Sequence, residues 1–187
     1  ITGGGEADTV TGGTGADNFV YNASTDGVDT YKDFDWGGGS TDTLTLTASS
    51  AIDDAAGNTG AVSTGIDGGS VSVASIGANT AIGGSATDEL FVIGTGADDT
   101  QFALDDTAGN IEGGIAAQLE DGTSIAGNLL AGEGFYGLIA NDDDGGGTVD
   151  SYFLFEYKEQ GSAGQAEAGD VNLVGIVEGT DAANAAA

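Results

Sequence analysis

A nine-residue repeat near the start of the chain places the strongest constraint on its fold. Residues 12–20 read Gly-Gly-Thr-Gly-Ala-Asp-Asn-Phe-Val and fit the pattern G-G-x-G-x-D-x-U-x at every specified position, U being a large apolar residue. The preceding residues 3–11 fit in the same register, except that Glu6 replaces a glycine. Because glycine adopts positive φ at no steric cost, each unit predicts a tight turn followed by a short strand.

Each unit also carries oxygen ligands for a cation. The aspartate of the pattern supplies a carboxylate, and the glycines allow main-chain carbonyls to point inward. Calcium is a hard ion that takes six to eight oxygens, so the units predict Ca²⁺ held as a structural joint between turns. The candidate ligands in the repeats are Gly3, Gly5, Glu6, Asp8, Gly12, Thr14 and Asp17. Glu6 either adds a ligand or spoils its turn.

Residues 1–47 resemble the end of a calcium-binding β-roll of the RTX (repeats-in-toxin) family. After the repeats, residues 27–34 (GVDTYKDF) and 42–46 (DTLTL) look like the closing segment of such rolls. The resemblance implies that Asp29 and Asp33 complete the last calcium sites, and that a few sites exist rather than a long ladder. Residues 152–157 and 171–175 are similar to a β-hairpin near the ends of secreted RTX-type proteins.

A second Gly/Asp block lies at residues 83–98. Its first part keeps the paired glycines, Asp88 and a large apolar residue, and residues 94–98 repeat the sequence of residues 13–17. Asp88 and Asp98 are therefore candidate metal ligands in a degenerate calcium turn, and a plain Gly-rich hairpin is the alternative. The acidic loop at residues 141–147 is either a solvated hairpin loop or a further calcium loop.

The charge balance restricts the partners of the chain. Its 187 residues include 31 Asp and Glu but only 2 Lys and Arg, for a net charge of −29. Nucleic-acid binding requires a basic face, which a chain with two basic residues does not have, so nucleic acid is not an expected partner. Membrane insertion is not expected either, because no apolar run is long enough. The absence of His and Cys excludes a conventional catalytic triad, a thiolate nucleophile and an ordinary zinc site. We therefore expect a protein that is not an enzyme and that has no catalytic residues.

The distribution of residues predicts an all-β fold, with a short calcium-binding parallel β-roll followed by β-sandwich-like antiparallel strands. The 36 glycines and absence of proline fit turns between strands. We expect one domain over residues 1–187, made of a β-roll (1–47), a small-residue segment (48–133) and a C-terminal hairpin with an Ala-rich tail (134–187). Strands are expected at 18–21, 28–34, 43–47, 70–76, 89–93, 135–140, 149–157 and 171–178, and a short helix at 115–119.

These expectations favour a secreted, calcium-binding structural protein, a subunit or module of an extracellular surface layer, filament or adhesin. Calcium would drive folding and self-association, and the resemblance suggests a Gram-negative-type bacterium. The alternative is a C-terminal secretion and folding domain of a larger type I-secreted exoprotein such as a protease, lipase or toxin; the absence of methionine fits a processed product or fragment. A third hypothesis is a carbohydrate-binding module or carboxylate enzyme, with Trp36, Phe135 and Tyr136 stacking on sugars.

Overall fold

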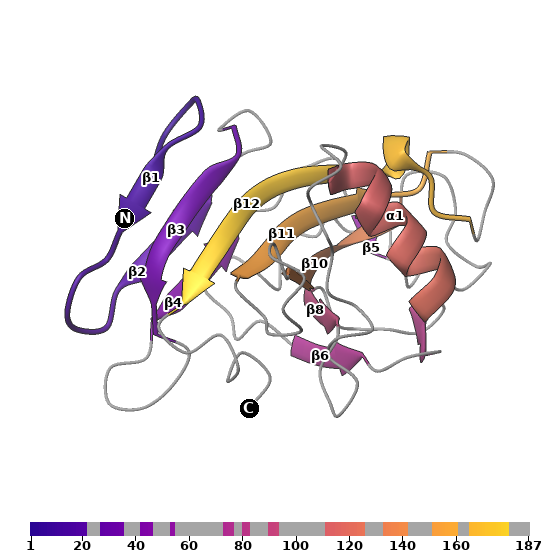
Figure 1. The fold of residues 1–187 in the computed structure, drawn as a ribbon, viewed down its shortest axis with the longest axis horizontal. Coiled ribbons are helices and arrows are strands. Elements are labelled where there is room, and N and C mark those ends of the chain that lie inside the picture. Colours follow the sequence, from indigo (N-terminus) through magenta and orange to yellow (C-terminus); the bar gives the residue numbers. More distant parts are fainter. Residues whose placement is uncertain are drawn as a thin grey trace.

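The computed structural model describes residues 1–21, 27–35, 42–46, 53–54, 73–76, 80–82, 90–93, 111–125, 133–141, 151–160 and 165–179. Over these residues the fold is all-β with one α-helix, which confirms the expected class (Figure 1). The main sheet has the strand order β1-β3-β12-β11-β10-β8-β6, and β5 also pairs with β10. Its strands are β1 (Thr9–Thr11), β3 (Asp29–Phe34), β5 (Asp53–Asp54), β6 (Val73–Ile76), β8 (Leu90–Ile93), β10 (Glu133–Asn141), β11 (Ser151–Lys158) and β12 (Val171–Gly179).

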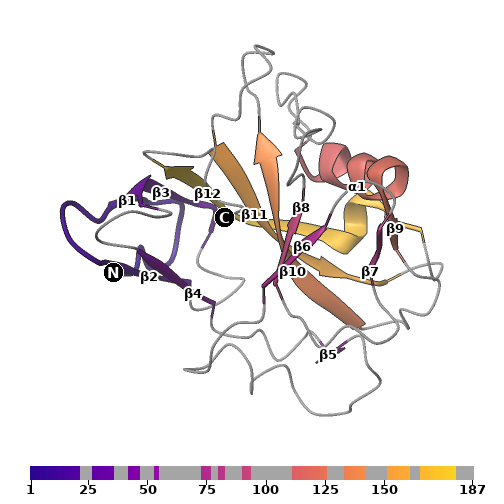
Figure 2. The same cartoon turned by 90° about the horizontal axis from the view of Figure 1, so that it is seen from below.

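Two further strand pairs lie outside the main sheet. Strands β2 (Asn18–Tyr21) and β4 (Thr43–Leu46) pair in parallel, and so do β7 (Thr80–Ile82) and β9 (Thr123–Ile125). Figure 2 shows the β2-β4 pair near the N-terminal strands and the β7-β9 pair near the helix. Successive N-terminal strands therefore alternate between two sheets, since β1 pairs with β3 in the main sheet and β2 with β4 in the other.

The main sheet joins the two ends of the chain. Strand β12 pairs in parallel with β3, which brings Ile176 opposite Thr30 and Val177 opposite Tyr31. Strand β11 is antiparallel to both of its neighbours, whereas β10, β8 and β6 run parallel to one another. A separate parallel β-roll, expected from the repeats, is not shown: the last strand of the chain adds directly to the sheet that the first repeat begins.

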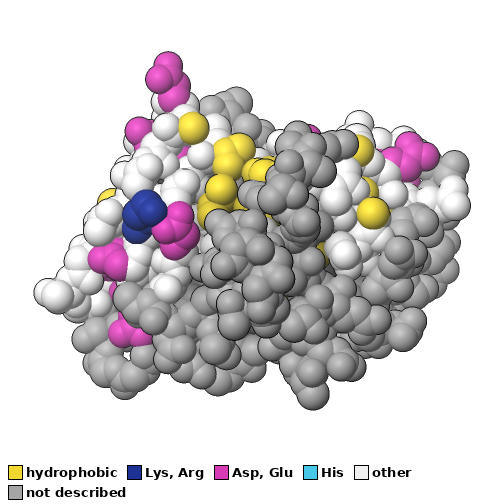
Figure 3. Space-filling view, in the orientation of Figure 1, with side chains coloured by type: hydrophobic (Ala, Val, Ile, Leu, Met, Phe, Trp, Pro, Cys, Tyr) yellow, Lys and Arg dark blue, Asp and Glu magenta, His cyan; other side chains and the backbone are white. Residues whose placement is uncertain are grey.

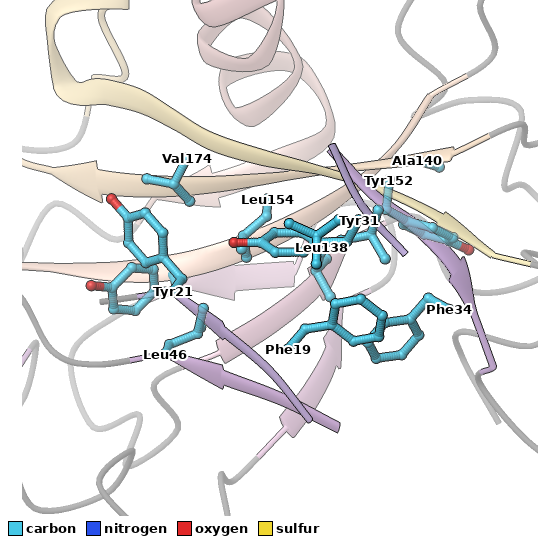
Figure 4. Close-up of a cluster of buried hydrophobic side chains, with 13 residues drawn as sticks. Phe19, Tyr21, Tyr31, Phe34, Leu46, Leu138, Ala140, Tyr152, Leu154 and Val174 are labelled. Atoms are coloured by element: carbon cyan, nitrogen blue, oxygen red, sulfur yellow. The ribbon is translucent and has the colours of Figure 1, made fainter. Parts of the chain in front are cut away.

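Alternation along β11 divides the core into two clusters on opposite faces of the main sheet. Tyr152 and Leu154 belong to one cluster, and Phe153, Phe155 and Tyr157 belong to the other. The first cluster, shown in Figure 4, also contains the buried side chains of β2, β3 and β4: Phe19, Tyr21, Tyr31, Phe34 and Leu46. The β2-β4 pair thus covers one face of the sheet. Each turn of the repeats is followed by a residue of this cluster, Val10 after the first and Phe19 after the second.

Helix α1 (Ile111–Gly122) covers the other face. Ile111, Ile115 and Leu119 recur every fourth residue and so lie on one side of the helix, packed with the side chains of the second cluster. The helix is longer than the expected 115–119. The expectation is too short because Gly113 and Gly114 weaken the helical signal that the apolar spacing gives. Phe135 and Tyr136 are buried in opposite clusters, so neither is available to stack on a sugar; Trp36 lies outside the described residues.

Each of the eight expected strands has a counterpart among the described residues, and the strand ends that are described differ by at most two residues. The expected strand residues 47, 70–72, 89 and 149–150 lie outside the described part of the chain. The 3-10 helix η4 (Ala168–Asp170) leads into β12. Within the part of the chain that is described, no helix combines the length and apolarity needed to cross a membrane.

Candidate metal-binding turns

The two repeat units form turns of the same backbone shape. We call residues 3–8 the first turn and residues 12–17 the second turn. Their second positions have nearly equal φ, 98° at Gly4 and 96° at Gly13, and their fourth positions are alike too, 103° at Glu6 and 122° at Gly15. Glu6 therefore takes a conformation that is natural for glycine and costly for a residue with a side chain. The substitution alters the residue but leaves the turn intact.

The strands that follow the two turns pair in parallel with other segments, and this pairing fixes where the turns lie. The Val20 amide donates to the Ile1 carbonyl over 2.7 Å, so Ile1 lies beside β2 two nine-residue units before it. Further along, Thr9 lies opposite Thr30 and Asn18 opposite Thr43. The first turn therefore precedes β1 and the second turn precedes β2. The segments that lead into β3 and β4 lie against these turns.

Asp29 closes the first turn. Its Oδ1 accepts a hydrogen bond from the Asp8 amide at 3.0 Å, and the adjacent Thr30 amide donates to the Asp8 carbonyl at 2.8 Å. The Asp29 side chain is 1% exposed, and a Cβ on Gly3 would lie 2.6 Å from its Oδ2. Glycine is therefore required at position 3 to leave room for this carboxylate.

Asp42 closes the second turn in the same way. Its Oδ1 accepts from the Asp17 amide at 2.8 Å, and the adjacent Thr43 amide donates to the Asp17 carbonyl at 2.8 Å. Its Oδ2 accepts from the Asp35 amide at 2.9 Å. Asp42 is not among the ligands predicted from the sequence, although the Asp-Thr dipeptide that it shares with Asp29-Thr30 marks both closing positions in the sequence.

Asp33 contacts the start of the second turn. Its two carboxylate oxygens accept hydrogen bonds from the Gly12 and Gly13 amides, both at 2.9 Å. Asp33 lies near the end of β3 and has φ of 57°, and its carboxylate faces Gly12 and Gly13. The side chain therefore joins the closing segment to the second turn rather than to the first.

Asp17 differs from these three aspartates. Its Oδ2 is the one buried carboxylate oxygen, within the part of the chain that the structure describes, that has no hydrogen-bond partner. A Cβ on Gly12 would lie 2.9 Å from this oxygen, so the glycine keeps a main-chain surface open beside it. Leaving a buried charged oxygen unpaired costs about 1–3 kcal/mol or more. A divalent cation is a chemical group that fits a buried anionic oxygen without a partner.

The structure distributes the expected ligands unevenly. Gly3, Gly5, Glu6 and Asp8 lie in the first turn, Gly12, Thr14 and Asp17 in the second, and Asp29 and Asp33 face main-chain amides; Asp88 and Asp98 fall outside the described residues. Over the described ranges, no three or more acidic side chains gather closely enough to hold a metal ion by themselves. Calcium at the second turn would therefore depend on main-chain oxygens as well as on Asp17.

Little positive charge is present to balance these carboxylates. Lys32, on β3, donates to Glu178 Oε2 on β12 over 2.6 Å, and the two side chains are 47% and 41% exposed. On the face shown in Figure 3, acidic side chains are spread over the N-terminal strands, whereas basic atoms occupy one spot. The pair links β3 to β12.

Comparison of the chain with family models, with curated proteins and with solved structures finds no match.

Proposed function

We propose that this chain is a secreted, calcium-binding structural protein, a subunit or module of an extracellular surface layer, filament or adhesin. The observation that carries the proposal is the Asp17 carboxylate, whose buried Oδ2 lacks a partner beside a glycine-rich turn. The net charge of −29 supports it, because a compact chain with so few cations gains from bound divalent ions. The fold places this turn next to the aromatic cluster that begins with Phe19.

Asp17 would hold the ion together with main-chain oxygens of Gly12 and Thr14, and Asp8 with Gly3, Gly5 and Glu6 would form the weaker counterpart in the first turn. When bound, calcium supplies positive charge and joins oxygens of neighbouring segments. The chain contributes turns whose shape is fixed by positive-φ glycines and by the closing aspartates.

Ion binding and folding are linked because the turns exist only in the folded chain. An ion that binds the folded state alone stabilises it by about 2.7 kcal/mol at one hundred times its dissociation constant. Secretion would then deliver the chain into calcium-rich surroundings, where the ion promotes folding and lowers the repulsion between copies. Self-association into a polymer or lattice is part of this proposal.

The test is calcium titration of the full chain by isothermal calorimetry, with wild type compared with Asp17→Asn. We expect wild type to bind at least one ion and the variant to bind one fewer, because Asn lacks the anionic oxygen. Glu178→Gln, which removes one charge away from the turns, serves as the matched control and should bind like wild type. Equal binding by wild type and Asp17→Asn would contradict the assignment of the site.

Sedimentation of the wild-type chain with and without calcium tests the proposed self-association. Calcium-dependent polymers support a structural subunit. Dispersed, folded monomers in calcium support the alternative of a secretion and folding domain from a larger exoprotein.

A further inference from the structure

The two closing aspartates make matching contacts on opposite sides of the N-terminal strands. Asp29 and Asp42 each precede a threonine, and each accepts a hydrogen bond from the amide of the last residue of a turn. The following threonine amide donates to the carbonyl of that same turn residue. Asp29-Thr30 thereby holds both peptide groups that flank Asp8. Asp42-Thr43 holds both peptide groups that flank Asp17.

From this geometry we infer that Asp29 and Asp42 are positioning residues, which fix the main chain of the ligand-bearing aspartates and do not themselves bind the metal. The inference rests on the proposed calcium function. It differs from what the RTX resemblance implies for Asp29, and it gives a role to Asp42.

The engagement of the oxygens supports this assignment. Both oxygens of Asp42 accept main-chain hydrogen bonds, from Asp17 and Asp35, and the side chain is 6% exposed. Asp29 Oδ1 accepts from Asp8, and its Oδ2 accepts from the Tyr31 hydroxyl at 3.4 Å. By contrast, Asp17 Oδ2 has no partner. The oxygen left for an ion therefore belongs to the residue that is held, not to the residue that holds it.

The same use of aspartate recurs elsewhere in the chain. Asp170 is 3% exposed, and its two oxygens accept from the Gln160 and Glu167 amides, both at 2.9 Å. Asp33 likewise accepts from two successive amides of the second turn. The buried Asp170 and the partly buried Asp33 thus each fasten two main-chain amides, which makes the same role natural for Asp29 and Asp42.

The decisive variant is Asp42→Asn, studied in the full chain. An asparagine keeps one acceptor oxygen but replaces the other by an amide group that donates, so it holds either the Asp17 amide or the Asp35 amide but not both. Calcium titration gives the number of ions and their affinity, and amide hydrogen exchange reports the hydrogen bonds of Asp17 and Asp35. Asp29→Asn is the second variant, and Glu178→Gln is the control for loss of one charge.

A positioning role predicts that Asp42→Asn binds as many ions as wild type with about 10–100-fold lower affinity. Exchange of the Asp17 or Asp35 amide should accelerate by about tenfold, as expected for loss of a hydrogen bond to a charged acceptor. In the double variant with Asp17→Asn, Asp42→Asn should cause little further loss of calcium binding, because it acts through Asp17.

Loss of one bound ion in Asp42→Asn would overturn the inference, since Asp42 would then be a ligand. Unchanged affinity together with unchanged exchange would overturn it as well. Absence of calcium binding by wild type is a different result: it would overturn the proposed function, while the exchange rates would still show whether Asp42 holds the second turn.

Discussion

At the scale of single residues, the acidic side chains of the N-terminal region divide into two kinds. Asp29, Asp33 and Asp42 accept main-chain hydrogen bonds, whereas Asp17 keeps a buried oxygen without a partner. The repeat pattern alone predicts a carboxylate at each position but not its partner. Asp42 was missed because its contact with Asp17 depends on how the chain between them closes, which the repeat period does not specify.

The glycines of the turns were predicted more successfully, because their requirement is local. Gly13 has φ of 96° and no atom within 4 Å of an added Cβ, whereas Gly5 has similar space without positive φ. Gly13→Ala should therefore lower the free energy of unfolding by about 1–2 kcal/mol through backbone strain alone. Gly5→Ala is the matched control and should be close to wild type in urea unfolding with calcium present. Equal stabilities for the two variants would contradict the assigned turn shape.

At the scale of elements, strands were predictable and their partners were not. The Thr-Leu alternation at residues 43–47 and the apolar run at residues 151–157 predict β4 and β11 from local pattern. The pairing of β12 with β3 joins segments from opposite ends of the chain, and no local pattern encodes it. The sequence therefore predicted an all-β chain, whereas the position of the closing strand beside the turns required the structure.

One sheet contact gives a direct test of the second core cluster. Gly137 on β10 lies opposite Phe155 on β11, and a Cβ at this position would lie 2.2 Å from the Phe155 ring. Gly137→Ala should therefore displace a ring that packs against Phe135 and lower the free energy of unfolding by about 1–3 kcal/mol. Gly169→Ala is the control, because nothing lies within 4 Å of a Cβ there. Equal free energies of unfolding in urea for the two variants would contradict the close packing of Phe155 against Gly137.

At the scale of the whole molecule, charge and fold work against each other in the absence of cations. A net charge of −29 on 187 residues repels itself when the chain is compact. Lys32, the basic side chain that links β3 to β12, forms an exposed ion pair, and such pairs contribute about 0–1 kcal/mol. Bound calcium would supply the compensation that the chain itself lacks, and would do so at turns tied through β3 to the C-terminal strand.

Stabilisation of this fold by calcium is tested most directly by urea unfolding of the full chain, followed by circular dichroism in calcium and in chelator at equal ionic strength. We predict a cooperative β-sheet transition in calcium and a much lower midpoint, or no folded baseline, in chelator. Magnesium at the same concentration should restore little, because it demands a smaller octahedral site. The same spectrum and midpoint in calcium and in chelator would show that calcium does not stabilise the fold.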